Sequence, residues 1–268
     1  MGSFGVLARK ELSAALLSPI AYTIATVFLL VLGYTFSLTL FATKVANLNY
    51  IFHQMYVLSI LLTPVLTMRA LAEERRNDTL ELLLSAPVAE VWIVLAKFVA
   101  AWAVLLAIYA LSGAYALVLA WVGEPDWGPI LLGYLALALL GGLLVAVGLL
   151  ASSMTENQVV AAAVSLGVFL MLWFADAVAP LLPGMLEPLA LNLSLIGHFR
   201  PLATGSVFLS DAMYFVSATL CALWLASRRL AERCARERHG PHNRLCRPAR
   251  AAARIRGRPA HAYRTFSA

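Results

Sequence analysis

The chain has 268 residues, of which 62% are hydrophobic and only 13% are charged. Soluble domains carry about 25% charged residues, so this composition excludes an ordinary soluble protein and favours the bilayer as the solvent for most of the chain. The formal charge of +6 comes from the C-terminal end, because residues 1–227 hold 8 Lys and Arg against 12 Asp and Glu, whereas residues 228–268 hold 12 Arg against 2 Glu. The body of the chain therefore lacks the basic balance of a nucleic-acid-binding protein, and we expect no nucleic-acid partner.

The first 19 residues predict an amphipathic helix that lies on the membrane surface. On a helix, one side of this segment is apolar and the other carries Arg9 and Lys10, although Glu11 falls on the apolar side. Pro19 ends the segment, because proline disfavours helical geometry in the residue before it. The apolar side consists of Phe4, Leu7, Ala8, Leu12, Ala15 and Leu16.

Six apolar stretches follow, and each predicts a membrane-spanning helix, which needs roughly 20 apolar residues. The second stretch is near the lower limit of this length and the sixth is below it. The third is long, and we expect its first turns, around Lys97, to lie on the cytoplasmic side of the membrane. The predicted spans lie near 20–41, 52–68, 91–122, 130–151, 159–182 and 212–226, within one transmembrane domain of residues 20–230.

The basic residues predict the orientation, since loops that stay in the cytoplasm carry an excess of Lys and Arg. If both ends are cytoplasmic, only Lys44 and Arg200 of the 20 Lys and Arg lie outside, and we therefore expect the N and C termini in the cytoplasm. The largest outer segment, 183–211, is apolar but too short to span, and we interpret it as a partial, re-entrant or interfacial helix. Residues 231–268 predict a basic, disordered cytoplasmic tail.

The segment between the second and third spans combines charges with a leucine cluster, "LELLL" at 80–84. Asp78 is a candidate N-cap with Glu81 three residues later, which is typical of a helix that begins at Thr79. Pro87 ends this helix after about two turns. Three interpretations are open: the leucines pack under the protein's own spans, they lie in the lipid interface, or they dock into a groove of a soluble partner.

Three stretches resemble the permease subunits of type-2 ABC transporters, most closely the gliding-motility-associated branch, with the nitrous-oxide-reductase maturation permeases nearby. They read "MRALAEERRNDTLELLLSAPVAEVWIVLAKF" (68–98), "RKELSAALLSPIAYTIATVFLLVLGYTF" (9–36) and "LSLIGHFRPLATGSVFLSDAMYFVS" (193–217). In that family the short helix after the second span is a cytoplasmic coupling helix, which sits in a groove of the ATP-binding subunit. The resemblance therefore favours the docking interpretation. Members of the family often have glycine where this chain has Asp78, and aspartate suits an N-cap.

By position, the resemblance assigns the contact with the ATP-binding subunit to a charged segment, 73–75, and to the short predicted helix that follows it. These residues are Glu73, Glu74, Arg75, Thr79, Leu80, Glu81, Leu82, Leu83, Leu84, Ser85 and Pro87.

The resemblance implies an all-α polytopic permease of an ABC exporter in the bacterial cytoplasmic (inner) membrane, which moves its substrate by alternating access. The implied partners, besides the lipid membrane, are a separate ATP-binding cassette subunit and a second permease subunit, identical or homologous. ATP and magnesium would be bound by the ATP-binding subunit, and no cofactor is expected in this chain. The alternative is a membrane anchor in a cell-surface or gliding assembly, with no substrate of its own. The substrate and the choice between a homodimer and a heterodimer remain open.

The motifs of the chain argue against an enzyme. None of the three lysines follows a glycine, so no Walker A sequence occurs, and neither HExxH nor GxSxG is present. No ionisable residue falls near the middle of a span, which disfavours an ion-coupled carrier and an intramembrane enzyme. Asp176, near the outer end of the fifth span, is interpreted as a carboxylate that reaches interfacial water rather than as a substrate contact. The spacing of Cys234, His239, His242 and Cys246 matches no common zinc module.

Small residues recur at a spacing of four in two spans, at Ala138, Gly142 and Ala146 and again at Ala163 and Gly167. This spacing lets membrane helices approach closely. We interpret both sets as packing within one subunit, with a contact between permease subunits as the alternative.

Overall fold

The computed structural model of the chain describes residues 3–43, 49–70, 90–122, 126–181, 183–184, 186–206 and 209–238. Within these ranges the ordered elements are all helices, which confirms the predicted all-α class. Six of them are long and apolar enough to cross a membrane, which confirms the predicted number of spans. The elements are α1 (Ser3–Leu16), α2 (Pro19–Thr43), α3 (Asn49–Thr67), α6 (Glu90–Val122), α7 (Trp127–Met154), α8 (Gln158–Val178), η1 (Ala179–Leu181), α9 (Glu187–Leu193), α10 (Leu195–Ala203) and α11 (Leu209–Arg238).

The largest difference from the predicted boundaries is at the last span. The apolar stretch 212–226 predicts a helix that is short for a membrane, but α11 has 30 residues and continues eight residues into the predicted tail, to Arg238. Apolar composition marks the part of a helix that lies in lipid and not the point where the helix ends. The residues that follow, "SRRLAERCARER", are mostly good helix formers, and they prolong the helix beyond its apolar part.

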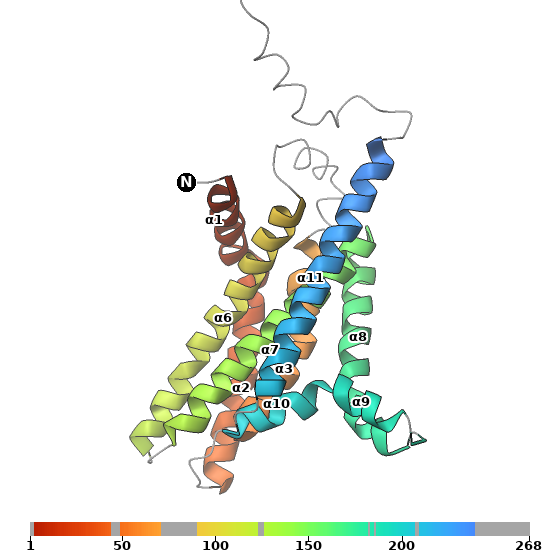
Figure 1. The fold of residues 1–268 in the computed structure, drawn as a ribbon. Coiled ribbons are helices and arrows are strands. Elements are labelled where there is room, and N and C mark those ends of the chain that lie inside the picture. Colours follow the sequence, from red (N-terminus) through yellow and green to blue (C-terminus); the bar gives the residue numbers. More distant parts are fainter. Residues whose placement is uncertain are drawn as a thin grey trace, which may run out of the picture.

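Helix α7 lies at the centre of the bundle. It packs against α3, α6, α8, α10 and α11, and Figure 1 shows it between α6 and α11 with α3 beside it. In its apolar stretch 61% of the residues are buried, compared with 17% for α8, which lies at the side of the bundle. The central position explains why α7 is apolar around its whole circumference, whereas most of the α8 stretch is not covered by the other described helices.

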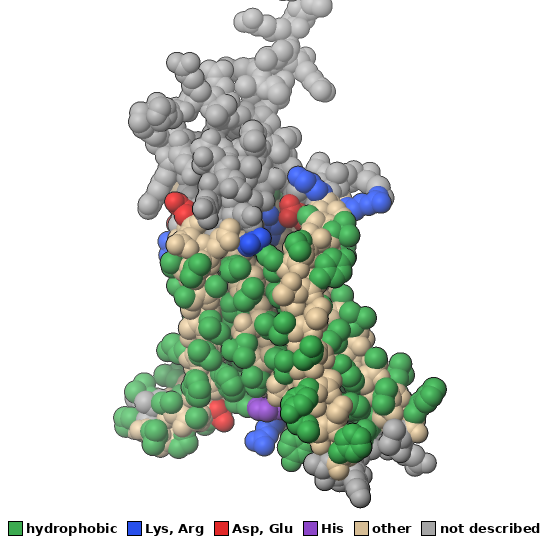
Figure 2. Space-filling view, turned by 180° about the vertical axis from the view of Figure 1, so that it is seen from behind, with side chains coloured by type: hydrophobic (Ala, Val, Ile, Leu, Met, Phe, Trp, Pro, Cys, Tyr) green, Lys and Arg blue, Asp and Glu red, His purple; other side chains and the backbone are tan. Residues whose placement is uncertain are grey.

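The two ends of the bundle differ in what they carry. Figure 1 shows α1 and the C-terminal end of α11 at one end, and α9 and α10 at the other. We name these ends the N-terminal face and the opposite face. In Figure 2 hydrophobic side chains cover the middle of the molecule, and the charged side chains gather towards the two ends. The position of α1 and of the C-terminal end of α11 on one face agrees with six spans, because an even number of crossings returns a chain to its starting side.

The apolar segment 183–211 forms two short helices, α9 and α10, in place of the single partial helix that the sequence predicts. Ser194 separates them, and its Oγ accepts a hydrogen bond from the backbone N–H of Gly197 at 3.1 Å, which caps the start of α10. Helix α10 is firmly embedded because it contacts α7, α8 and α11. Its buried side chains are Leu195, Phe199, Leu202 and Ala203.

The first set of small residues packs within the chain, as predicted. Trp102 of α6 donates a hydrogen bond from Nε1 to the carbonyl oxygen of Ala138 at 2.9 Å, and a Cβ atom on Gly142 would lie 3.6 Å from the same Nε1. For the second set the prediction is wrong. Ala163 and Gly167 lie on an exposed face of α8, and no atom lies within 4 Å of a Cβ built on Gly167.

Candidate functional site

The predicted docking segment lies outside the described residues. All of its members fall between residues 71 and 89, so the structure leaves their assignment as a prediction: Glu73, Glu74, Arg75, Thr79, Leu80, Glu81, Leu82, Leu83, Leu84, Ser85 and Pro87. The structure does describe the two helices that flank the segment. Helix α3 ends at Thr67 and α6 begins at Glu90, and both of these ends lie towards the N-terminal face (Figure 1).

The end of α3 is fixed against the central helix. Thr67 is fully buried, and its side chain lies against the backbone of Gly148 in α7, so closely that a Cβ on this glycine would come within 2.8 Å of the Thr67 Cβ. One turn further along α7, Ser152 donates a hydrogen bond from Oγ to the carbonyl oxygen of Met68 at 3.3 Å. Two contacts, at Thr67 and at Met68, thus join the end of α3 to α7.

The start of α6 is fixed by α1. Helix α1 packs along α6, and Lys97 Nζ lies 3.3 Å from Glu11 Oε2. The sequence predicts that the first turns of this span, around Lys97, lie on the cytoplasmic side; in the structure Lys97 is only 5% exposed and lies against α1. The position of Glu11 on the apolar side of the N-terminal helix, unexplained by periodicity, follows from this pair: the apolar side faces α6, where Lys97 supplies the opposite charge.

Helix α3 carries a row of buried hydroxyls. Along α3, Ser59, Thr63 and Thr67 are fully buried at a spacing of four, and each bonds to the carbonyl oxygen one turn before it, at 2.7, 2.6 and 3.0 Å. The Oγ of Ser59 also lies 2.7 Å from the Oη of Tyr109 in α6. Because these hydroxyls are satisfied within the protein, this row can remain in an apolar bundle without a charge.

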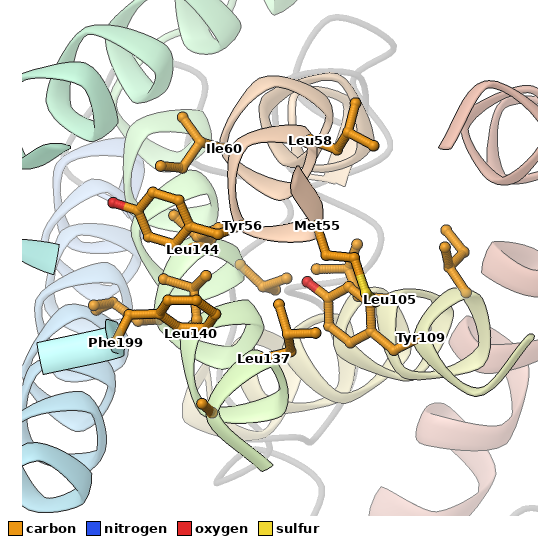
Figure 3. Packing of buried hydrophobic residues seen from close by; sticks show 14 of the residues in the cluster. Met55, Tyr56, Leu58, Ile60, Leu105, Tyr109, Leu137, Leu140, Leu144 and Phe199 are labelled. Carbon is orange, nitrogen blue, oxygen red and sulfur yellow. The ribbon is translucent and has the colours of Figure 1, made fainter. Parts of the chain in front are cut away.

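Tyr56 of α3 differs from these hydroxyls. It is fully buried, and its Oη has no hydrogen-bond partner among the described residues. Its ring lies 5.0 Å from that of Phe199 in α10 and 6.1 Å from that of Trp173 in α8, measured between centroids. In Figure 3 the Tyr56 ring lies beside Phe199, with its hydroxyl pointing away from Tyr109. Tyr56 is thus the point where α3, α8 and α10 meet.

A histidine–aspartate pair joins α10 to α11 at the opposite face. His198 Nδ1 lies 2.8 Å from Asp211 Oδ1, and His198 Nε2 lies 3.2 Å from the carbonyl oxygen of Asn192. The imidazole ring stacks on Tyr214 with 4.2 Å between centroids. The sequence analysis overlooked this pair, because the two residues are separated by thirteen positions and a turn and form no known motif.

Two hollows lie on either side of α10, and both are lined by Ile196, Arg200 and Thr204. The first, of about 440 Å³, reaches Asp176 of α8, and the second, of about 470 Å³, reaches His53 of α3 and the buried Phe199. Asp176 is exposed, and its contact with interfacial water stays a prediction. The opposite face therefore brings apolar, aromatic and charged side chains together beside α10.

The described residues contain no group of three or more His, Cys, Asp or Glu side chains that could hold a metal ion. The side chains of Cys234, His239, His242 and Cys246 lie outside the described residues.

Comparison with protein families matches residues 37–213 to the family described as ABC-2 family transporter protein. This stretch is about two thirds of the chain, and it runs from within α2 to the beginning of α11. It therefore includes the predicted docking segment and both hollows beside α10. No curated protein matches the chain.

Proposed function

The chain belongs to the ABC-2 transporter family, and we propose that it is the membrane-spanning subunit of an ABC exporter driven by a separate ATP-binding subunit. Membership makes it a multi-pass permease component of an ABC transporter, in agreement with its six apolar helices. The proposal adds the partner, the direction of transport and the bacterial cytoplasmic membrane. We place it near the gliding-motility-associated and nitrous-oxide-reductase maturation permeases on the resemblance of its sequence motifs.

The proposed contact with the ATP-binding subunit is the segment from Glu73 to Pro87, with the leucine cluster as its buried part. A short helix that carries several leucines outside the lipid suits a groove on a partner, because it removes their apolar surface from water. The observation that supports this most is the way the flanking helices are held. The end of α3 is bonded to α7 through Ser152, and the start of α6 is joined to α1 through the pair of Lys97 with Glu11.

This attachment suggests how movement in the partner reaches the membrane. Closure of two ATP-binding subunits would displace the segment between α3 and α6 in each of two permease subunits, identical or homologous. Since α3 and α6 both contact α7, their displacement would move the centre of the bundle and change which side the pathway faces. Substrate leaving on the opposite face would meet Arg200, His53 and Asp176 beside α10.

A pull-down from detergent-solubilised membranes tests the proposal. We expect the tagged wild-type chain to carry an ATP-binding subunit with it, and a Leu82→Glu/Leu83→Glu variant to lose that subunit. The matched control is Leu189→Glu/Leu191→Glu on α9, because these two leucines are exposed on the opposite face, and it should keep the subunit.

Failure to recover any ATP-binding subunit with wild type, under conditions that preserve membrane complexes, would contradict the proposal. The anchor without a substrate would then become the better interpretation. An ATPase activity that rises on addition of a substrate would argue against the anchor.

A further inference from the structure

Helix α9 is held at its C-terminal end by side chains from two other helices. None of its residues is buried, although it packs against α8 and η1. His198 of α10 lies with Nε2 3.2 Å from the carbonyl oxygen of Asn192, and Tyr214 of α11 donates a hydrogen bond from Oη to the carbonyl oxygen of Leu193 at 3.0 Å. The last carbonyl groups of a helix have no partner within the helix, so these two contacts supply what the end of α9 lacks.

The His198 ring faces an acceptor with each of its two nitrogens. Nδ1 lies 2.8 Å from Oδ1 of Asp211, and Nε2 faces the Asn192 carbonyl oxygen, which can only accept. A neutral imidazole has one N–H donor and turns a lone pair to its other neighbour, whereas an imidazolium has two donors. Both hydrogen bonds therefore form only when the pair of His198 and Asp211 holds two protons, one at Nε2 and one between Nδ1 and Oδ1.

Asp211 is the charged group of the neighbouring helices that contacts this ring, and Tyr214 stacks on it. Arg200 follows His198 by two positions on α10, and residues at this spacing do not face each other on a helix. The other charged residues of α11 begin at Arg228, about five turns further along. The remaining titratable side chains of α3, α7, α8 and α9 make no hydrogen bond, ion pair or ring contact with His198 in the described part of the chain: Tyr50, His53, Tyr56, Tyr134, Asp176 and Glu187.

Loss of one proton from the pair breaks the contact with α9 and not the contact with α11. Asp211 is only 7% exposed, and a buried carboxylate without a partner costs more free energy than a carbonyl group that water can reach. The contact between His198 and Asn192, in contrast, is exposed to solvent. The remaining proton therefore stays between Nδ1 and Asp211, and the lone pair of Nε2 is left facing the Asn192 carbonyl oxygen.

We propose that His198 makes the attachment of α9 dependent on pH. With both protons in place, its ring joins α9, α10 and α11; after loss of one proton, the end of α9 keeps the bond from Tyr214 and loses the bond from His198. Histidine ordinarily changes its charge between about pH 5 and 8, whereas carboxylates and phenols titrate outside this range. Because the attached state holds the additional proton, the attachment is complete at low pH and weakens as the pH rises. It does not depend on the exporter function, since it involves contacts within one chain.

Hydrogen–deuterium exchange with mass spectrometry on the full-length chain in nanodiscs tests the proposal. Peptides that cover Glu187–Leu193 are compared at about pH 5.5 and about pH 8.5, on either side of the ordinary range of histidine, after correction for the pH dependence of the intrinsic exchange rate. We expect the corrected exchange of α9 in wild type to be about fivefold faster or more at the higher pH, which is the effect of one lost hydrogen bond. Exchange of α10 should change less, because its bond with Asp211 stays.

Three variants identify the group that responds. His198→Gln removes the titrating ring, so the exchange of α9 should become equal at the two pH values. His53→Gln is the matched control, because His53 is an exposed histidine on the same face, and it should respond as wild type does. Tyr214→Phe removes the hydroxyl that bonds to Leu193 and keeps the ring beside His198. It should speed the exchange of α9 at both pH values and leave their ratio unchanged.

Exchange of α9 that is the same at both pH values in wild type would overturn the proposal. A response that persists in His198→Gln, or one that disappears in His53→Gln, would overturn it as well, because another group would then be responsible. Melting temperatures in detergent show which variants are folded. If His198→Gln is not, wild type and Tyr214→Phe still decide, since the proposal requires the pH response in both.

Discussion

At the scale of single residues, the packing of the central helix depends on glycines where a neighbouring helix presses on its backbone. A Cβ on Gly133 would lie 2.5 Å from the ring of Phe52, and a Cβ on Gly148 would overlap the side chain of Thr67. Gly133 has no small residue four positions away, and Gly148 has only Ser152, whereas Ala138, Gly142 and Ala146 form a row of three; the sequence therefore pointed to that row. Such a contact depends on which residue of the partner helix lies opposite the glycine. The sequence of one helix does not contain this information.

Substitution of Gly148 by alanine should lower the stability of the protein. The new Cβ would meet the Cβ of Thr67 at 2.8 Å, and Thr67 is fully buried and bonded to the Thr63 carbonyl, so it has no free direction in which to move. Overpacking of this kind costs about 1–3 kcal/mol. The melting temperature in detergent should therefore fall by several degrees.

Gly167→Ala is the matched control for this substitution, because the space around Gly167 is open. Its melting temperature should equal that of wild type or exceed it, since alanine favours a helix over glycine. Equal loss of stability in the two variants would show that the contact between α3 and α7 is not as close as described.

Two buried tyrosines should respond in opposite directions to removal of the hydroxyl. Tyr56→Phe removes an oxygen that has no partner among the described residues, and a buried unsatisfied group costs about 1–3 kcal/mol. This variant should melt at the same temperature as wild type or higher. Tyr109→Phe breaks the 2.7 Å contact with Ser59, at a cost of about 1 kcal/mol, and should lower the melting temperature by about 2–4 °C. A Tyr56 variant that is less stable than the Tyr109 variant would show that the Tyr56 hydroxyl is bonded.

At the scale of helices, the sequence identified elements better than it identified their partners. The 3.6-residue pattern of residues 1–19 predicted α1, and α1 is a helix. That its partner is α6 follows from the pair of Glu11 with Lys97, which are 86 residues apart. In the same way, the apolar segment 183–211 predicted helical structure on the opposite face. The division at Ser194 and the burial of α10 depend on contacts with α7, α8 and α11, which the segment alone does not contain.

The attachment of α10 to α11 should depend on Asp211. This carboxylate is 7% exposed, and its Oδ1 lies at hydrogen-bond distance, 2.8 Å, from Nδ1 of His198. A hydrogen bond to a charged group stabilises a protein by about 1.5–3 kcal/mol. Asp211→Ala should therefore raise the hydrogen-exchange rate of the backbone amides of α10 by about tenfold or more. The measurement is hydrogen–deuterium exchange with mass spectrometry on peptides that cover Leu195–Ala203.

Asp176→Ala provides the comparison for this prediction. Asp176 is also a carboxylate on the opposite face, but it is exposed and has no hydrogen bond among the described residues. Its loss should leave exchange in α10 unchanged. If both variants, or neither, raised the exchange of α10, the histidine–aspartate pair would not be what holds this helix.

At the scale of the whole molecule, the number of spans followed from the sequence because the bilayer requires long apolar segments and the chain has six of them. Helix α1 and the C-terminal end of α11 lie at the same face of the bundle (Figure 1). The positive-inside rule predicts that this face is cytoplasmic, and the predicted docking segment would then leave and re-enter the bundle on the same side. The predicted role of Leu80 to Ser85 rests on the family resemblance, since it concerns a second polypeptide.

Site-specific photo-crosslinking tests the central claim most directly. A benzoylphenylalanine in place of Leu83 should form an adduct with an ATP-binding subunit in native membranes, and the same probe in place of Leu189 on α9, on the opposite face, should form none. This result would place the docking segment against the ATP-binding subunit and would show that the N-terminal face is cytoplasmic. An adduct from Leu189, or only lipid adducts from Leu83 while the complex is intact, would contradict the account.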